Sequence, residues 1–279
     1  MTAPEPLSAD GSALLDEGRP VEAIEVLRQA VASGEPSAPA LLLRAYFDSG
    51  SWRAVVDWLG PLVEDGDVRW AGQLGVALAG LGDVGNAEAA LRLAVENGEL
   101  AAANDLAILL RDERRLPEAV QVLLRATEAG DLQAPANLVE LLLEDGDVPA
   151  AADVAQRYRD ESRPDTLVAL ADVCVAQRRD EDAESLYRRA GQLGALRAHT
   201  AYGTFLLEVR GDPEGAEREF LEARWHAEPG WAYTLGRFLI DDGRGDEARP
   251  VLQIAVDSGD QAAADALAEL DGVDPNDEL

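Results

Sequence analysis

Lysine is absent from this chain. All 24 basic side chains are arginine, they face 54 acidic residues, and the formal net charge is −30. Because phosphate contacts need cationic side chains in excess, this balance argues against direct binding of nucleic acid and favours a basic partner. A simpler interpretation is that the acids keep an exposed array soluble. The lack of lysine beside abundant Ala, Gly, Arg and Asp is typical of GC-rich bacterial genes, actinobacterial ones among them.

Cysteine, aromatic residues and long apolar runs are also scarce. The single Cys174 excludes an intrachain disulfide framework and fits a reducing compartment. Aromatic residues make up 5% of a chain that is 47% hydrophobic, so the core must consist mainly of Ala and Leu. No run approaches the ~18 apolar residues of a membrane span, and residues 1–6 lack the features of a secretory signal. We therefore expect a cytoplasmic protein without membrane contact.

What the chain does have is a repeat of 32 residues, lengthened by one residue before Ala216. A small apolar residue returns at each step: Ala23, Val55, Ala87, Ala119, Ala151, Ala183, Ala216 and Ala248. A bulky apolar residue follows four positions later, except at Ala155, and a glycine follows eleven positions later in six of the eight copies. A register kept this long predicts an all-α solenoid of about eight helix-turn-helix repeats.

Each copy is expected to form two helices. In residues 100–131, the segment 103–110 carries apolar side chains at helical spacing. Pro117 then opens the second helix, and Gly130 ends it in a left-handed cap. An acid follows this glycine in five copies, as Asp131 does here, and we expect it to cap the helix that comes next.

The repeat also sets the expected boundaries. We expect repeats at residues 4–35, 36–67, 68–99, 100–131, 132–163, 164–195, 196–228 and 229–260, followed by a capping helix at 261–271. The solenoid then covers 7–271, between a disordered N-terminus at 1–6 and an acidic disordered tail at 272–279. Regularity fails at the extra residue between Gly203 and Gly211. It also fails at Arg114 and Arg178, which replace the glycine between the two helices.

Helix pairs with this pattern resemble the tetratricopeptide repeat (TPR), with some similarity to its Sel1-like variant. The family has Leu and a small residue in the first helix, which appear here as Leu74-Gly75, Leu106-Ala107, Leu170-Ala171 and Leu235-Gly236. The second-helix pattern is the series that begins at Ala23. The period is shorter than the family's usual ~34 residues, and glycine replaces the proline that often closes the second helix.

The resemblance implies an adaptor or scaffold that holds a partner segment in a concave groove lined by the first helices. The groove residues that it carries onto this chain are Arg44, Arg69, Gln73, Asn104, Ile108, Arg111, Asn137, Glu140, Glu144, Asp172, Tyr233 and Arg237. In the wider groove set, which adds Asp48, Asp105, Asp112, Gln133, Asp165, Glu208 and Asp241 among others, acids outnumber arginines by nine to four. The partner should therefore be a basic or mixed-charge protein or peptide.

Asn104 and Asn137 stand out within that set. An asparagine amide both donates and accepts, so it can pair with the main chain of an extended peptide whatever the peptide's sequence. The two residues fall in adjacent repeats and could contact one peptide together. The alternative is two solvated surface amides.

Little in the chain points to catalysis. Cys174 and His199 fall on the apolar face of the pattern, where core packing is expected, and His226 lacks a third partner. No metal-ligand spacing or phosphate-binding loop is present, so we predict no enzyme activity, no cofactor and no metal. Two alternative functions remain open: an acidic mimic of nucleic acid that occupies a basic partner, and an accessory subunit of an enzyme complex. A tryptophan left on the outer face would mark a second candidate surface.

Overall fold

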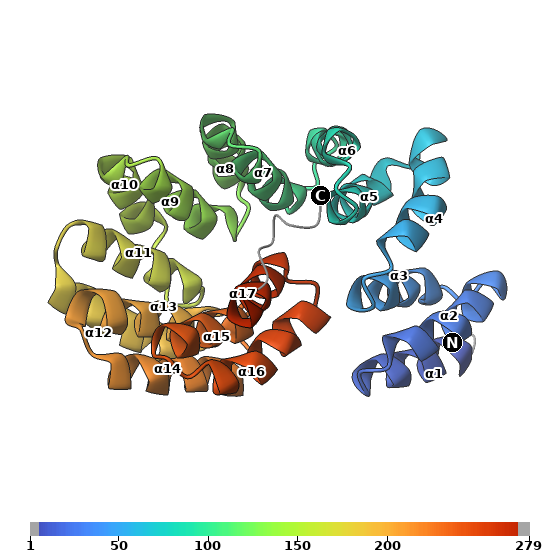
Figure 1. The fold of residues 1–279 in the computed structure, drawn as a ribbon. Coiled ribbons are helices and arrows are strands. Elements are labelled where there is room, and N and C mark those ends of the chain that lie inside the picture. Colours follow the sequence, from blue (N-terminus) through green and yellow to red (C-terminus); the bar gives the residue numbers. More distant parts are fainter. Residues whose placement is uncertain (1–5, 273–279) are drawn as a thin grey trace. The chain divides into compact units, whose positions relative to one another are not determined.

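The computed structural model describes residues 6–272, and within that range the chain is built from helices and turns, with no β-strand (Figure 1). This confirms the prediction of an all-α repeat solenoid. It divides into two compact units, residues 1–122 (unit 1) and 123–279 (unit 2). None of the helices in the described range is long and apolar enough to cross a membrane.

The helices follow the repeat in pairs. Unit 1 contains α1 (Pro6–Asp16), α2 (Pro20–Ala32), α3 (Ala38–Asp48), α4 (Trp52–Glu64), the 3₁₀ helix η1 (Val68–Trp70), α5 (Ala71–Gly80), α6 (Val84–Glu96) and α7 (Ala102–Asp112). The unit boundary falls inside α8 (Leu116–Ala129). Unit 2 contains α9 (Ala134–Glu144), α10 (Val148–Tyr158), α11 (Asp165–Ala176), α12 (Asp180–Gln192), α13 (Ala198–Phe205), the π-helix η2 (Leu206–Arg210), α14 (Pro213–Trp225), α15 (Trp231–Asp241), α16 (Gly245–Asp257) and the capping helix α17 (Gln261–Asp271).

Of the ends expected to be disordered, residues 1–5 and 273–279 lie outside the described range. Pro6 was expected to belong to the N-terminal end but is instead the first residue of α1. Proline suits this position because its fixed φ is helical and its missing N–H would have no partner there.

Within each unit, consecutive helices pack against each other, and first helices also contact the first helix of a neighbouring repeat. Such contacts join α1 to α3 and α5 to α7 in unit 1, and α9 to α11, α11 to α13 and α15 to α17 in unit 2. The first helices of a unit therefore lie together on one side of the solenoid, as the repeat predicts.

The 32-residue series marks residues that are buried where the two helices of each repeat pack together. All eight of its residues, from Ala23 to Ala248, are fully buried, and the residue four positions later, bulky in all copies but that of Ala155, is buried in every copy. Small residues in the first helix make room for that bulky side chain. A Cβ at Gly75 would lie 2.6 Å from Leu91, and one at Gly203 would lie 2.5 Å from Phe220. The period is thus fixed by contacts between the two helices of each repeat.

The turn between the two helices has the same backbone in every copy. The residue that ends the first helix has a positive φ in all eight, and in six of them it is glycine. Arg114 and Arg178 take the same left-handed conformation, each at φ 61°. An L-residue in this conformation costs about 1–2 kcal/mol. The two arginines therefore carry strain that glycine would not.

The acids that follow the second helix divide by side-chain length. Asp131 and Asp260 accept N–H groups of the next helix, from Ala134 and Ala263, as predicted. Glu35 and Glu228 instead reach back to the first helix of their own repeat. Glu35 accepts the Ser8 N–H at 2.7 Å, and Glu228 accepts the N–H groups of His199 and Thr200 at 2.9 Å.

Glu99 behaves like the other two glutamates, because its carboxylate lies against Gly72 at the start of α5. The prediction that every junction acid caps the following helix is therefore wrong for the glutamates. Their extra methylene lets the carboxylate reach the other end of the repeat.

The extra residue of the seventh repeat is absorbed by the π-helix η2, which ends at Arg210 and is followed by the left-handed Gly211. One added residue widens a helical turn without shifting the following helix out of register. Phe205 and Phe220, on either side of it, remain buried in the core of unit 2.

Candidate functional site

A hollow of about 520 Å³ lies on the first-helix side of unit 2. We call it the α9–α11 groove. Its lining comes from α9 and the residues before it (Leu132, Gln133, Ala136, Asn137, Glu140), from α11 and the loop before it (Ser162, Arg163, Pro164, Asp165, Thr166, Val168, Ala169, Asp172), and from Leu196 and Arg197 ahead of α13. A volume of this size is typical of ligand-binding clefts.

The loop ahead of α11 forms one wall and is held by its own polar groups. Asp160 accepts the Ser162 N–H at 2.9 Å, and its own N–H donates to the Thr166 hydroxyl at 2.9 Å. Hydrogen bonds from Ser162 and the Arg163 guanidinium hold the pKa of Asp160 below its ordinary value. Arg163 also donates to the Leu132 carbonyl at 3.3 Å, which ties this wall to the residues ahead of α9.

The residues ahead of α13 form the opposite rim. Asp165 of α11 accepts the Leu196 N–H at 2.7 Å. Arg197 lies 3.4 Å from Glu140, so this ion pair joins residues 57 positions apart in the sequence. Two neighbouring first helices and the start of a third are thus held around one hollow.

Asp172 is the most buried acid of the groove. Its Oδ1 accepts the Tyr187 hydroxyl from α12 at 2.5 Å. Burial raises the pKa of Asp172 to about 6, although the Tyr187 hydrogen bond and the nearby Arg197 act in the opposite direction. Burial and the adjacent Asp172 charge also raise the pKa of Tyr187. Tyr187 therefore stays protonated and is a hydrogen-bond donor at neutral pH.

Three of the predicted site residues, Asn137, Glu140 and Asp172, line the α9–α11 groove. Gln133 and Asp165, from the wider predicted set, line it as well. Elsewhere in unit 2, Glu144 is exposed, Tyr233 packs half-buried against the core, and Arg237 is bound to Glu269 at 2.9 Å.

The predicted residues of unit 1 have different surroundings. Arg44 pairs with Asp16 and Asp48, Arg69 with Asp67, and Arg111 with Asp112, all within 3.5 Å. Gln73 is half-buried beside Glu99, and Ile108 is exposed. Asn104 is 9% exposed, so it offers little surface to a partner. It belongs to unit 1 and Asn137 to unit 2, and a joint role for them stays a prediction.

Sequence reasoning missed Arg163, Leu196 and Arg197, because they lie in connecting segments and not on first helices. A signal was present in the repeat. The glycine–acid junction is broken at Ser162-Arg163 and again at Gly194-Ala195, directly beside these residues. Where the junction acid is missing at Ala195, Asp165 of α11 supplies the carboxylate that binds the next N–H group.

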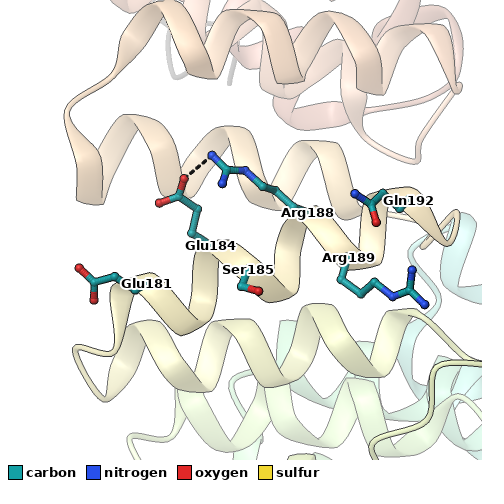
Figure 2. A pocket seen from close by; sticks show the side chains of 6 residues that line it. All are labelled: Glu181, Glu184, Ser185, Arg188, Arg189 and Gln192. Carbon is teal, nitrogen blue, oxygen red and sulfur yellow. Dashed lines mark hydrogen bonds and ion pairs between the residues drawn. The ribbon is translucent and has the colours of Figure 1, made fainter.

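Two further hollows involve second helices. One, of about 510 Å³, runs along α12, and Figure 2 shows its six lining side chains, from Glu181 to Gln192. Its charges are paired, Arg188 with Glu184 at 2.5 Å and Arg189 with Glu161 at 2.6 Å. The other, of about 390 Å³ in unit 1, is lined by Trp58 and by Tyr46, whose hydroxyl accepts from Arg28. Neither contains a residue of the predicted site.

The reactive residues are placed as follows. Cys174 is buried, as predicted, and burial raises the pKa of its thiol. His199 is not in the core. It is half-buried at the start of α13, where its ring stacks on His226 with centroids 5.1 Å apart, and Nδ1 lies 2.8 Å from Glu219. Among residues 6–272 no group of His, Cys, Asp and Glu is arranged to hold a metal ion.

Residues 104–166 match a family model described as tetratricopeptide repeat, and residues 166–193 match a second model with the same description. A search of the curated proteins gives no match.

Among solved structures, a tetratricopeptide repeat protein from Parabacteroides merdae ATCC 43184 is similar at 12% identity and a TM-score of 0.55, over 95% of this chain and 96% of that one. A thermophilic TPR protein of Thermus thermophilus is similar at 19% identity and a TM-score of 0.51, over 62% and 97%. The APC/C hetero-tetramer Cut9-Hcn1 gives 12% identity and a TM-score of 0.53 over 95% of this chain, which spans 55% of the length of that one. At these identities the likeness concerns the fold.

Proposed function

This chain is a tetratricopeptide-repeat protein, and from that premise we propose that its α9–α11 groove binds an extended, basic or mixed-charge segment of a partner protein. The repeat fold supports an adaptor or scaffold for protein–protein interaction in general. The finer proposal includes a cytoplasmic location, no enzymatic activity, and no direct contact with nucleic acid or membrane.

The observation that carries the proposal is the convergence of exposed leucines and acids in one hollow. Leu132 is 66% exposed and Leu196 is 58% exposed, and both line the groove. Large apolar side chains left open to solvent beside a cleft are typical of an interaction site. The leucines would contact apolar side chains of the segment, and the carboxylates between them would face its basic ones.

The main chain of the segment also has groups to bind. Asn137, on α9, and Gln133, just before it, carry amides that both donate and accept, as an extended backbone requires. Charge at the rim would mainly speed encounter and exclude wrong partners, while the leucines and amides would set the lifetime of the complex.

Selection from a displayed library of random 12-residue peptides tests the proposal. The selected peptides should be rich in Arg or Lys with apolar neighbours, and Ala136→Trp, which fills the groove, should weaken them by about tenfold or more. The matched control is Ala262→Trp, at an exposed alanine of α17. Equal binding by both variants, with unchanged melting temperatures, would place the binding surface elsewhere.

One observation favours a second candidate, an accessory subunit held through the second helices. Trp225 of α14 is 83% exposed, and Leu221, one turn before it, is also exposed. Tryptophan is enriched at interface hot spots. On this alternative Trp225→Glu would abolish capture of an enzyme complex from native lysate, and Ala136→Trp would leave that capture unchanged.

A further inference from the structure

The carboxylate of Asp172 has an incomplete set of partners. Oδ1 accepts the Tyr187 hydroxyl, but Oδ2 receives no hydrogen bond from any residue in 6–272. The side chain is half-buried and lines the α9–α11 groove, as Val168 and Ala169 do. Oδ2 is not a buried, unsatisfied oxygen, so it is an acceptor open to a group that enters the groove.

The cation nearest to this carboxylate is engaged with another acid. Arg197 is close enough to lower the pKa of Asp172, yet its ion pair is with Glu140, at 3.4 Å. That distance is long for a charged hydrogen bond, which is usually about 2.7–2.9 Å. Glu140 itself raises the pKa of Asp172. The guanidinium that faces Asp172 is thus bound, loosely, to a different carboxylate.

We propose that Asp172 is the anchor of the α9–α11 groove and binds the ammonium or guanidinium group of a lysine or arginine side chain from the partner segment. The inference rests on the proposed function of the groove and adds the group that selects its ligand. The incoming cation would bind Oδ2, while Tyr187 keeps Oδ1 satisfied and holds the carboxylate in place.

Arg197 then acts as an internal competitor. Its side chain is about half exposed, so it can leave the groove when a stronger cation arrives. Loss of Asp172 and loss of Arg197 should therefore change the affinity for a cation in opposite directions. A merely structural role for this cluster would weaken binding in both variants.

The acidity of the site gives an independent signature. The titratable groups that act on Asp172 are Glu140 of α9, Tyr187 of α12 and Arg197 ahead of α13, and Asp165, on its own helix, lines the same groove. Protonation of Asp172 near pH 6 would remove its charge, whereas an ordinary exposed carboxylate keeps its charge to about pH 4.5. Cation binding should therefore fall between pH 7.5 and pH 5.

The test uses two small probes on the full chain, acetyl-arginine methylamide and its citrulline counterpart, which has a similar shape without the charge. Their affinities are measured by NMR titration of the amides in α11. We expect the arginine probe to bind wild type about tenfold more tightly than the citrulline probe. Asp172→Asn should abolish this preference, and Arg197→Gln should increase it about threefold. Lowering the pH from 7.5 to 5 should reduce it.

The matched control is Asp153→Asn in α10 of unit 2, an exposed carboxylate on a second helix that does not line the groove. It should behave as wild type. A preference for arginine that survives Asp172→Asn, or no binding of either probe up to 50 mM, overturns the anchor. If the anchor test fails but Ala136→Trp still weakens the library peptides, the groove remains the binding site. Failure of the anchor and failure of the groove are therefore distinguishable.

Discussion

Unit 1 and unit 2 use the same repeat, but the arginines of the α9–α11 groove come from other segments than the predicted groove arginines of unit 1. In unit 1, Arg44 and Arg69 pair with acids on the same helix, the preceding first helix or the adjacent turn. At the groove of unit 2, Arg163 and Arg197 come from connecting segments. Arg163 bonds to the Leu132 carbonyl, and Arg197 reaches Glu140 on another helix.

The difference follows from the junctions. Each junction acid of unit 1 that the structure describes is used within its own repeat or the adjacent turn: Glu35 holds the start of α1, Asp67 binds Arg69, and Glu99 lies at the start of α5. In unit 2 two successive junctions lack the acid, at Arg163 and Ala195. A regular junction uses its own acid, whereas a broken one relies on a neighbouring carboxylate: Asp160 pairs with Arg163, and Asp165 of α11 binds the Leu196 N–H.

The largest effect should come from filling the small-residue positions. Gly203→Val places a Cβ against the Phe220 ring, and Gly75→Val places one against Leu91. Overpacking of this kind costs about 3 kcal/mol. Because repeat arrays are held by nearest-neighbour contacts, Gly203→Val should also abolish binding in the groove, while Gly75→Val should spare it.

Hydrogen exchange of the amides checks this prediction, since it reports stability segment by segment. Protection should be lost around α13 and α14 in the first variant, and around α5 and α6 in the second. Equal loss across both units in either variant would mean that they unfold together and cannot be treated as separate.

A smaller effect is expected at Asp172, and it should raise stability. Its pKa is raised to about 6 in the folded protein, above the ordinary 3.8, so the folded state holds the ionised form poorly. Asp172→Asn should therefore stabilise unit 2 by about 1–2 kcal/mol at pH 7.5. The gap should shrink as the pH falls through 6 and vanish near pH 4, where wild type is protonated as well.

Urea unfolding at pH 7.5, 6 and 4 measures this gap. Asp105→Asn in unit 1 is the matched comparison and should give a smaller gain, because that residue is more exposed. If Asp172→Asn is more stable and binds the arginine probe less well, Asp172 lowers stability in favour of function. A destabilised Asp172→Asn would instead make the Tyr187–Asp172 bond a structural one.

The sequence predicted the solenoid well because the repeat is a packing rule that every copy obeys. The burial of Ala23 and its seven counterparts, and the left-handed turns, follow from spacing alone. The groove was predicted in part. Asn137, Glu140 and Asp172 belong to the predicted set because of their register on first helices. Arg163 and Arg197 do not, because contacts between distant segments do not recur with the period of the repeat. His199 was misplaced because Glu219 and His226, which contact it, stand 20 and 27 positions away.

The smallest effect concerns a feature that the two units share. Arg114→Gly in unit 1 and Arg178→Gly in unit 2 each remove the strain of a left-handed arginine, offset in part by the greater freedom of glycine in the unfolded chain. A net gain of about 0.5–1 kcal/mol is expected in each. Gly146→Arg, at the equivalent turn before α10, should lose a similar amount, and urea unfolding of all three variants checks both signs. Matching gains at positions 114 and 178 would mean that the turns are interchangeable between units, so that the difference between the units lies in their junctions. Unequal gains would mean that one arginine makes contacts that offset its strain. The two units would then differ at that turn as well as at their junctions.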